Sequence, residues 1–255
     1  MLHLSPRPLP QQRVVWDSIA CAPEPARVAS DTDHFGNRVT WLFLDRPHAR
    51  FEVVAEAEVE TAFPAPPLAG LTPPWEQVAA EAARHPEAAE FTYPSPMLPE
   101  QAAARAYAAL SFPAGRPVLE GLLELNGRIK RDFTFRAGVT GIATPVAQVL
   151  AQRAGVCQDF TNLMLCGLRG LGLPARYVSG YIRTRPPPGG VARGSAPTSR
   201  MPGWAPGWAS PSAGSTSTPP TTWWCSRSMW CWAGGATSTT SPRCAASSWA
   251  AASTG

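Results

Sequence analysis

The chain has 255 residues, of which 44% are hydrophobic and 29 are proline, so it is long enough for one large or two small globular domains with many loops. The formal net charge is +4, but residues 1–190 carry as many acidic as basic residues. The excess comes from four scattered arginines: Arg193, Arg200, Arg227 and Arg243. This distribution excludes the basic patch of a nucleic-acid-binding protein.

The first residues, MLHLSPRPLP, contain no apolar run of a signal peptide, and no stretch reaches the length of a membrane span. The 6 cysteines form no CxxC pair and no disulfide-framework spacing. We therefore expect a cytoplasmic protein that binds neither membrane nor nucleic acid. The sequence leaves its oligomeric state open.

Residues 11–60 are typical of β-strands. The segments QQRVVWDSIA and RVTWLFL are rich in β-branched and aromatic residues, and RFEVVAEAEVE alternates apolar with polar residues. DTDHFGN supplies the Asp, Gly and Asn of a tight turn. The pattern predicts an antiparallel β domain over residues 1–65, followed by a proline-rich linker over residues 66–74.

From residue 75 the pattern becomes helical, in WEQVAAEAARHPE, EQAAARAYAAL and PVLEGLLELNGRIKRDF. Pro145 opens a further helix, PVAQVLAQRAG. The next helix starts at Cys157, carries an apolar stripe and ends at GLGLP, after which ARYVSGYI is typical of a strand. Fold class is therefore α+β, with a helix-rich second domain over residues 75–190.

Cys157 is the candidate nucleophile. A helix start lowers the pKa of a thiol, because its unpaired N–H groups favour the thiolate. Gly155 would let the backbone approach a substrate, and the amide of Cys157 could stabilise an oxyanion. The alternative is that Cys157 is a small buried hydrophobe, as we expect for Cys166. Asp159 is expected to cap the first turn. Nearby residues offer no metal-ligand spacing, and no cofactor is expected.

The last 65 residues, 191–255, have a different composition. They hold seven of the ten tryptophans and no Leu, Ile, Phe, Tyr, Asp, Glu, Asn, Gln, His or Lys. Ser, Thr, Pro, Gly and Ala dominate, so little is available to bury and we expect a disordered tail. Such a vocabulary is also typical of GC-rich DNA translated in a wrong frame.

The segment GVCQDFTNLMLCGLRGLGLPARYVSGYIRTRPPPG resembles the catalytic segment of bacterial transglutaminase-like proteins. RIKRDFTFRAGVTGIATPVAQVLAQRAGVCQDF resembles the stretch before it, and the β segment with DHFGN resembles the N-terminal domain of that family. The resemblance covers about residues 2–190 and implies a papain-like Cys-His-Asp triad, with Cys157 as nucleophile. It also implies a further strand ahead of LHLSPRPL. The His of a HAWV-like strand and the Asp of a DPTN motif are absent.

With permitted third codon bases, a neighbouring reading frame can encode both motifs. Joining the third base of each codon to the first two of the next turns TSRMPGW into a text containing His-Ala-Trp-Val. The same shift turns STSTPPTTWWCSRSMWCW into Asp-Phe-Asp-Pro-Thr-Asn followed by an apolar-rich text. The sequence therefore indicates a frameshift between about Gly190 and Gly194.

These observations predict a transglutaminase-like cysteine acyl-transfer enzyme, either a hydrolase (protease or amidase) or an acyltransferase. Its substrate would be a protein or peptide amide, attacked by Cys157. As written, the chain would be inactive, because the His and Asp are missing. The alternative is a non-enzymatic peptide-binding pseudoenzyme on the same fold.

Overall fold

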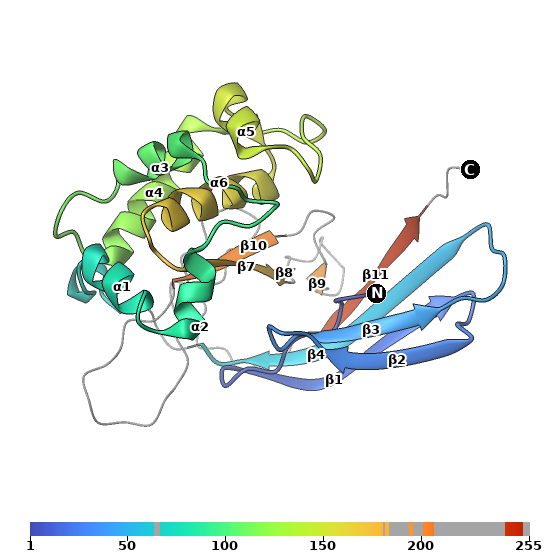
Figure 1. Cartoon of the computed structure of the whole chain (residues 1–255). Coiled ribbons are helices and arrows are strands. Elements are labelled where there is room, and N and C mark those ends of the chain that lie inside the picture. Colours follow the sequence, from blue (N-terminus) through green and yellow to red (C-terminus); the bar gives the residue numbers. More distant parts are fainter. Residues whose placement is uncertain (64–66, 181, 184–193, 196–200, 207–242, 252–255) are drawn as a thin grey trace, which may run out of the picture. The chain divides into compact units, whose positions relative to one another are not determined.

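The computed structural model describes residues 1–63, 67–180, 182–183, 194–195, 201–206 and 243–251 (Figure 1). By contacts the chain divides into two compact units. One comprises residues 1–65, 181–197 and 235–255, and the other comprises residues 66–180 and 198–234. The boundaries that the sequence suggests for its domains remain predictions. No helix in the described part is long and apolar enough to cross a membrane.

The first unit is made of antiparallel strands. β1 (Gln12–Ala22) pairs with β4 (Phe51–Thr61), from Gln12 opposite Thr61 to Ala22 opposite Glu52. β2 (Arg27–Thr32) pairs with β3 (Arg38–Phe43). The antiparallel β structure expected from the alternating sequence is therefore present.

The turn between β2 and β3 has the chemistry that DTDHFGN indicates. The Asp33 carboxylate accepts hydrogen bonds from the backbone and side-chain N–H groups of Asn37, at 2.8 and 2.9 Å. These two bonds hold the pKa of Asp33 below its ordinary value, since they stabilise the charged form. β2 lies within the strand-like region 11–60, but the sequence does not single it out, because RVASDT is mostly polar and does not alternate strongly.

The second unit is helix-rich. Its α-helices are α1 (Trp75–Ala82), α2 (Pro86–Ala89), α3 (Ala102–Ala109), α4 (Val118–Asp132), α5 (Val146–Gln152) and α6 (Cys157–Gly170). α6 lies at the centre, and its residues 159–168 are buried without interruption. A helix that is buried on every side needs partners all round, and α3, α4, α5 and the strand β7 (Ala175–Gly180) supply them (Figure 1).

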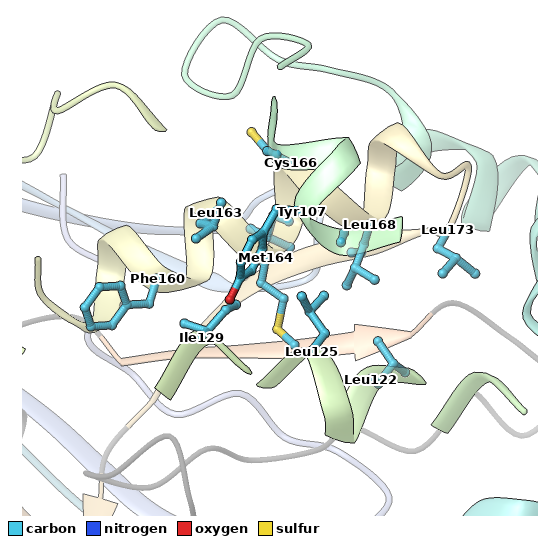
Figure 2. Close-up of a cluster of buried hydrophobic side chains, with 14 of the residues drawn as sticks. Tyr107, Leu122, Leu125, Ile129, Phe160, Leu163, Met164, Cys166, Leu168 and Leu173 are labelled. Carbon is cyan, nitrogen blue, oxygen red and sulfur yellow. The ribbon is translucent and has the colours of Figure 1, made fainter. Parts of the chain in front are cut away.

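The core lies between α4 and α6. Leu122, Leu125 and Ile129 of α4 pack in one cluster with Leu163 and Leu168 of α6 (Figure 2). Each of these five side chains is at most 2% exposed. The apolar faces expected for both helices are confirmed.

α3 lies very close to α6. A Cβ atom added at Gly167 would come within 2.7 Å of the Cβ of Ala108 and 3.0 Å of the carbonyl oxygen of Ala104. Glycine is therefore required where these two helices cross. Cys166, on the same turn, is buried in this core as expected, with its Sγ 3.7 Å from the carbonyl oxygen of Pro99.

The tail contains strands where the sequence predicts no regular structure. They are β9 (Gly194–Ser195), β10 (Met201–Pro206) and β11 (Arg243–Ala251). β9 pairs with β8 (Ile182–Arg183), β10 with β7, and β11 with the free edge of β4. The pairing uses backbone groups, which a Ser- and Ala-rich composition also provides. The remaining residues of the expected disordered tail lie outside the described residues.

Candidate active site

Cys157 is the first residue of α6, where the sequence predicts it. Two short strands lead to it: β5 (Thr134–Phe135) and β6 (Ala154–Gly155) pair in parallel, with Phe135 opposite Gly155. Val156 then adopts an extended conformation and the helix begins. The N–H of Asp159 donates to the carbonyl oxygen of Val156 at 2.9 Å. The N–H groups of Cys157 and Gln158 come before the first bond of the helical ladder, so they are the candidate donors beside the thiol.

Asp159 closes this helix start. Its carboxylate oxygen Oδ2 accepts hydrogen bonds from the backbone N–H of Val156 at 2.7 Å and from Oγ1 of Thr140 at 2.6 Å. The side chain is buried, with the residue only 2% exposed. The expected capping role of Asp159 is therefore confirmed, while its second partner, Thr140, was not expected. No spacing pattern links a loop threonine to a carboxylate 19 residues further on.

The interpretation of Gly155 as a point of substrate approach is wrong. A Cβ atom at this position would lie 2.7 Å from Oδ2 and 3.0 Å from the Cβ of Asp159. The space beside the Gly155 backbone is filled by the Asp159 side chain. Glycine is needed here because the carboxylate folds back over residue 155 to reach the N–H of Val156.

The segment 136–142 runs beside the start of α6. The backbone N–H of Arg136 donates to the carbonyl oxygen of Gly155 at 2.8 Å. Further along, the side-chain amide of Gln158 donates to the carbonyl oxygen of Ile142 at 3.3 Å. Ile142 and Phe135 are large apolar side chains that remain 65% and 60% exposed. The start of α6 is thus flanked by exposed apolar side chains.

The expectation of a depressed thiol pKa is also wrong. Burial raises the pKa of the Cys157 thiol above its ordinary value, and the negative charge of Asp159 raises it further. A hydrogen bond from the backbone of Cys157 opposes these effects without outweighing them. The helix start lowers the pKa of the thiol, but the half-buried position and the adjacent carboxylate together raise it by more.

This electrostatic balance predicts how Cys157 reacts with iodoacetamide. Since only the thiolate reacts, the alkylation rate should still be rising with pH above the ordinary thiol range. Asp159→Asn removes the negative charge and should move the midpoint to lower pH. Rates measured by mass spectrometry of the Cys157 peptide over a pH series check this, with Cys21 and Cys166 as internal references. A midpoint below that of a free thiol, or one insensitive to Asp159→Asn, would contradict this account.

The other thiols of the described part lie in different surroundings. Cys21 is on β1, with its Sγ 3.5 Å from the carbonyl oxygen of Pro23, and Cys166 is in the core of the helical unit. Burial raises the pKa of both. What distinguishes Cys157 is therefore its place at a helix start rather than its acidity. Its acidity therefore gives no reason for Cys157 to be alkylated faster than Cys21.

Of the four histidines, three lie in the first unit and one lies ahead of α2. His3 lies 3.5 Å from Asp33, His48 lies 3.0 Å from the carbonyl oxygen of Arg46, and the His34 ring contacts Phe35. His85 precedes α2, and its carbonyl oxygen accepts two helix N–H groups. The charged side chain that acts on the Cys157 thiol is Asp159. Within the described residues, no group of three or more His, Cys, Asp or Glu is arranged for a metal ion.

Two family descriptions match the chain. "Bacterial transglutaminase-like N-terminal region" matches residues 1–60, and "Transglutaminase-like superfamily" matches residues 109–223. The second match includes Cys157 and β10. The two matched regions together include β1–β3, β4 up to Glu60, and the helices α4, α5 and α6.

Related proteins come from mycobacteria. Uncharacterised proteins of Mycobacterium tuberculosis and Mycobacterium bovis are 39% identical over 189 residues, which is 73% of this chain and 60% of theirs. One from Mycobacterium leprae is 30% identical over 185 residues, covering 72% of this chain and 64% of that protein. The chain thus spans less than two thirds of the length of these relatives.

A solved structure shares the fold. It is described as a candidate cysteine protease from Cytophaga hutchinsonii and matches with a TM-score of 0.52 at 20% identity. The match covers 71% of this chain and 60% of that one.

Proposed function

The chain belongs to the transglutaminase-like superfamily, and on that premise we propose that Cys157 is the nucleophile of a cysteine acyl-transfer reaction. The observation that carries the proposal is the position of Cys157 as the first residue of the central helix. In that position its sulfur lies beside N–H donors that could stabilise an oxyanion. The proposed substrate is a protein or peptide amide.

In the proposed reaction the Cys157 sulfur attacks the amide carbon, and the carbonyl becomes a tetrahedral oxyanion. The C–N bond then breaks, the amine leaves after accepting a proton, and a thioester remains. Water converts the thioester to a carboxylate, which is the hydrolase outcome, whereas an amine converts it to a new amide, which is the acyltransferase outcome. Both routes return the free thiol.

The raised pKa of Cys157 makes a general base necessary. At neutral pH the group is a thiol, so a base must take its proton before attack, and an acid must protonate the leaving amine. A histidine performs both steps in Cys-His enzymes. The resemblance implies a histidine on a strand after β7, and residues 191–255 contain none.

The position of strand β10 supports a frameshift as the reason why the histidine is missing. α6 has 14 residues and β7 has 6, so both are about 20 Å long. Only residues 171–174 join them, so β7 runs back along the helix and ends at Gly180, near the level of Cys157. Met201 at the start of β10 pairs with Gly180. With permitted third bases, the shifted text His-Ala-Trp-Val begins at the last base of the Arg200 codon and the first two bases of the Met201 codon.

A peptide-binding pseudoenzyme is the second candidate. It is favoured by the raised thiol pKa and by Asp159 as the charge acting on that thiol, because neither activates a nucleophile. Sequencing the gene through the Gly190 codons separates the two. An extra or missing base supports the enzyme, whereas an intact frame supports the pseudoenzyme.

The experiment for the proposed function is to trap the thioester. The protein is expressed from a gene whose reading frame is corrected near the Gly190 codon, and we call it the frame-restored protein. It is incubated with a glutamine-containing peptide, quenched in acid and digested. The mass of the Cys157 peptide is then measured by mass spectrometry. The proposal predicts an acyl adduct on Cys157 that hydroxylamine removes. Cys157→Ala should carry no adduct, and an adduct on Cys21 or Cys166 instead would refute the assignment.

A further inference from the structure

The segment 136–142 is fastened to the start of α6 at three points. Arg136 N–H bonds the carbonyl of Gly155 at 2.8 Å, Thr140 bonds Asp159 at 2.6 Å, and Gln158 bonds the carbonyl of Ile142 at 3.3 Å. The middle bond is the shortest, and its acceptor is the buried carboxylate.

A single carboxylate oxygen joins this segment to the residue before the nucleophile. Oδ2 of Asp159 accepts both the Thr140 hydroxyl and the Val156 N–H. Two donors on one oxygen fix the rotation of the carboxylate, and the carboxylate in turn fixes the Val156 N–H. The peptide that follows carries the N–H of Cys157, which is the candidate oxyanion donor.

We propose that Thr140 is a positioning residue for Cys157, acting through Asp159. Its hydroxyl holds the carboxylate where it orients the residue before the nucleophile and, at the same time, keeps segment 136–142 beside the thiol. A hydrogen bond to an ionised group is among the stronger ones in proteins, so losing it loosens both attachments. The functional side of this inference rests on the proposed acyl-transfer reaction.

The charged side chains to consider lie on the described elements around the start of α6. Asp159 on α6 acts on the sulfur directly. Arg153, ahead of β6, has its guanidinium 4.9 Å from the ring centre of Phe133, and Arg136, after β5, is exposed. If Thr140 holds the carboxylate beside the sulfur, its loss lets the carboxylate turn away from the sulfur, which lowers the pH at which Cys157 reacts.

The chain offers a matched control. Thr144 lies four residues after Thr140, and its Oγ1 accepts the Gly141 N–H within the same loop. Thr144→Val therefore removes a hydroxyl of the same kind from the same loop without touching Asp159. Thr140→Ser keeps the donor and serves as the rescue, while Thr140→Val removes it at nearly constant shape.

The test uses the full chain and two measurements. Hydrogen exchange at Val156 should accelerate about tenfold in Thr140→Val, which corresponds to the loss of one charge-assisted hydrogen bond. The alkylation midpoint of Cys157 should move to lower pH in the same variant. Thr140→Ser and Thr144→Val should match the parent in both. If Thr140→Val does not fold, Thr140→Ala removes the same donor without added bulk.

Unchanged exchange and an unchanged midpoint in Thr140→Val would overturn the proposal, as would equal effects of Thr144→Val. Faster exchange with an unchanged midpoint would reduce Thr140 to a loop attachment and overturn its positioning role. None of these measurements needs turnover. If the frame-restored protein forms no thioester, that result refutes the proposed function but leaves the role of Thr140 standing.

Discussion

The frame-restored protein should form the Cys157 thioester on the order of 10⁴ to 10⁶ times faster than the present chain. The size of the effect follows from the way nucleophile, base and orienting acid act as one unit: losing the base removes nearly the whole contribution. The raised pKa of Cys157 increases the rate difference that the general base makes, because little thiolate exists at neutral pH to react without a base.

The measurement is single-turnover acylation with one peptide amide and both forms of the protein. Cys157→Ala in the restored frame gives the background rate. A sharper control replaces only the restored histidine by alanine. This variant lacks the general base but keeps the restored strands. Equal rates in the two parent forms would refute the frameshift account. Activity that survives Cys157→Ala would refute the nucleophile.

The helical half of the fold could be read from the sequence because its signals are local. Leu122, Leu125 and Ile129 repeat at helical spacing, and the structure buries all three. Cys157 starts its helix as the sequence indicates, because the apolar stripe begins just after it. Such features depend on neighbours within a few residues, which a pattern along the chain records.

The features that could not be predicted depend on residues that meet only in space. Thr140 and Asp159 form their bond across a loop, and no period or motif joins them. The acidity of Cys157 depends on how deeply the folded chain buries it, which outweighs the helix start. The strands β9, β10 and β11 pair through backbone groups, so the composition of the tail conceals them.

Gly155→Ala should destabilise the helical unit by about 2–4 kcal/mol, the cost of one extra methyl group in a packed site plus a disturbed buried hydrogen-bond pair. The added Cβ would lie 2.7 Å from Oδ2 of Asp159, closer than such atoms approach. The carboxylate must therefore move away from both the Val156 N–H and the Thr140 hydroxyl. Because Asp159 is only 2% exposed, water cannot readily replace these partners.

Urea unfolding followed by the helical circular dichroism signal measures this cost, since the described α-helices all belong to that unit. Gly141→Ala is the matched control: nothing lies within 4 Å of an added Cβ there, so its effect should stay within about 1 kcal/mol. A double mutant identifies the cause. Asp159→Ala removes the atom that the new methyl group strikes, so Gly155→Ala should cost much less in that background than in the parent. Equal costs in both backgrounds would show that the glycine is needed for something other than the carboxylate.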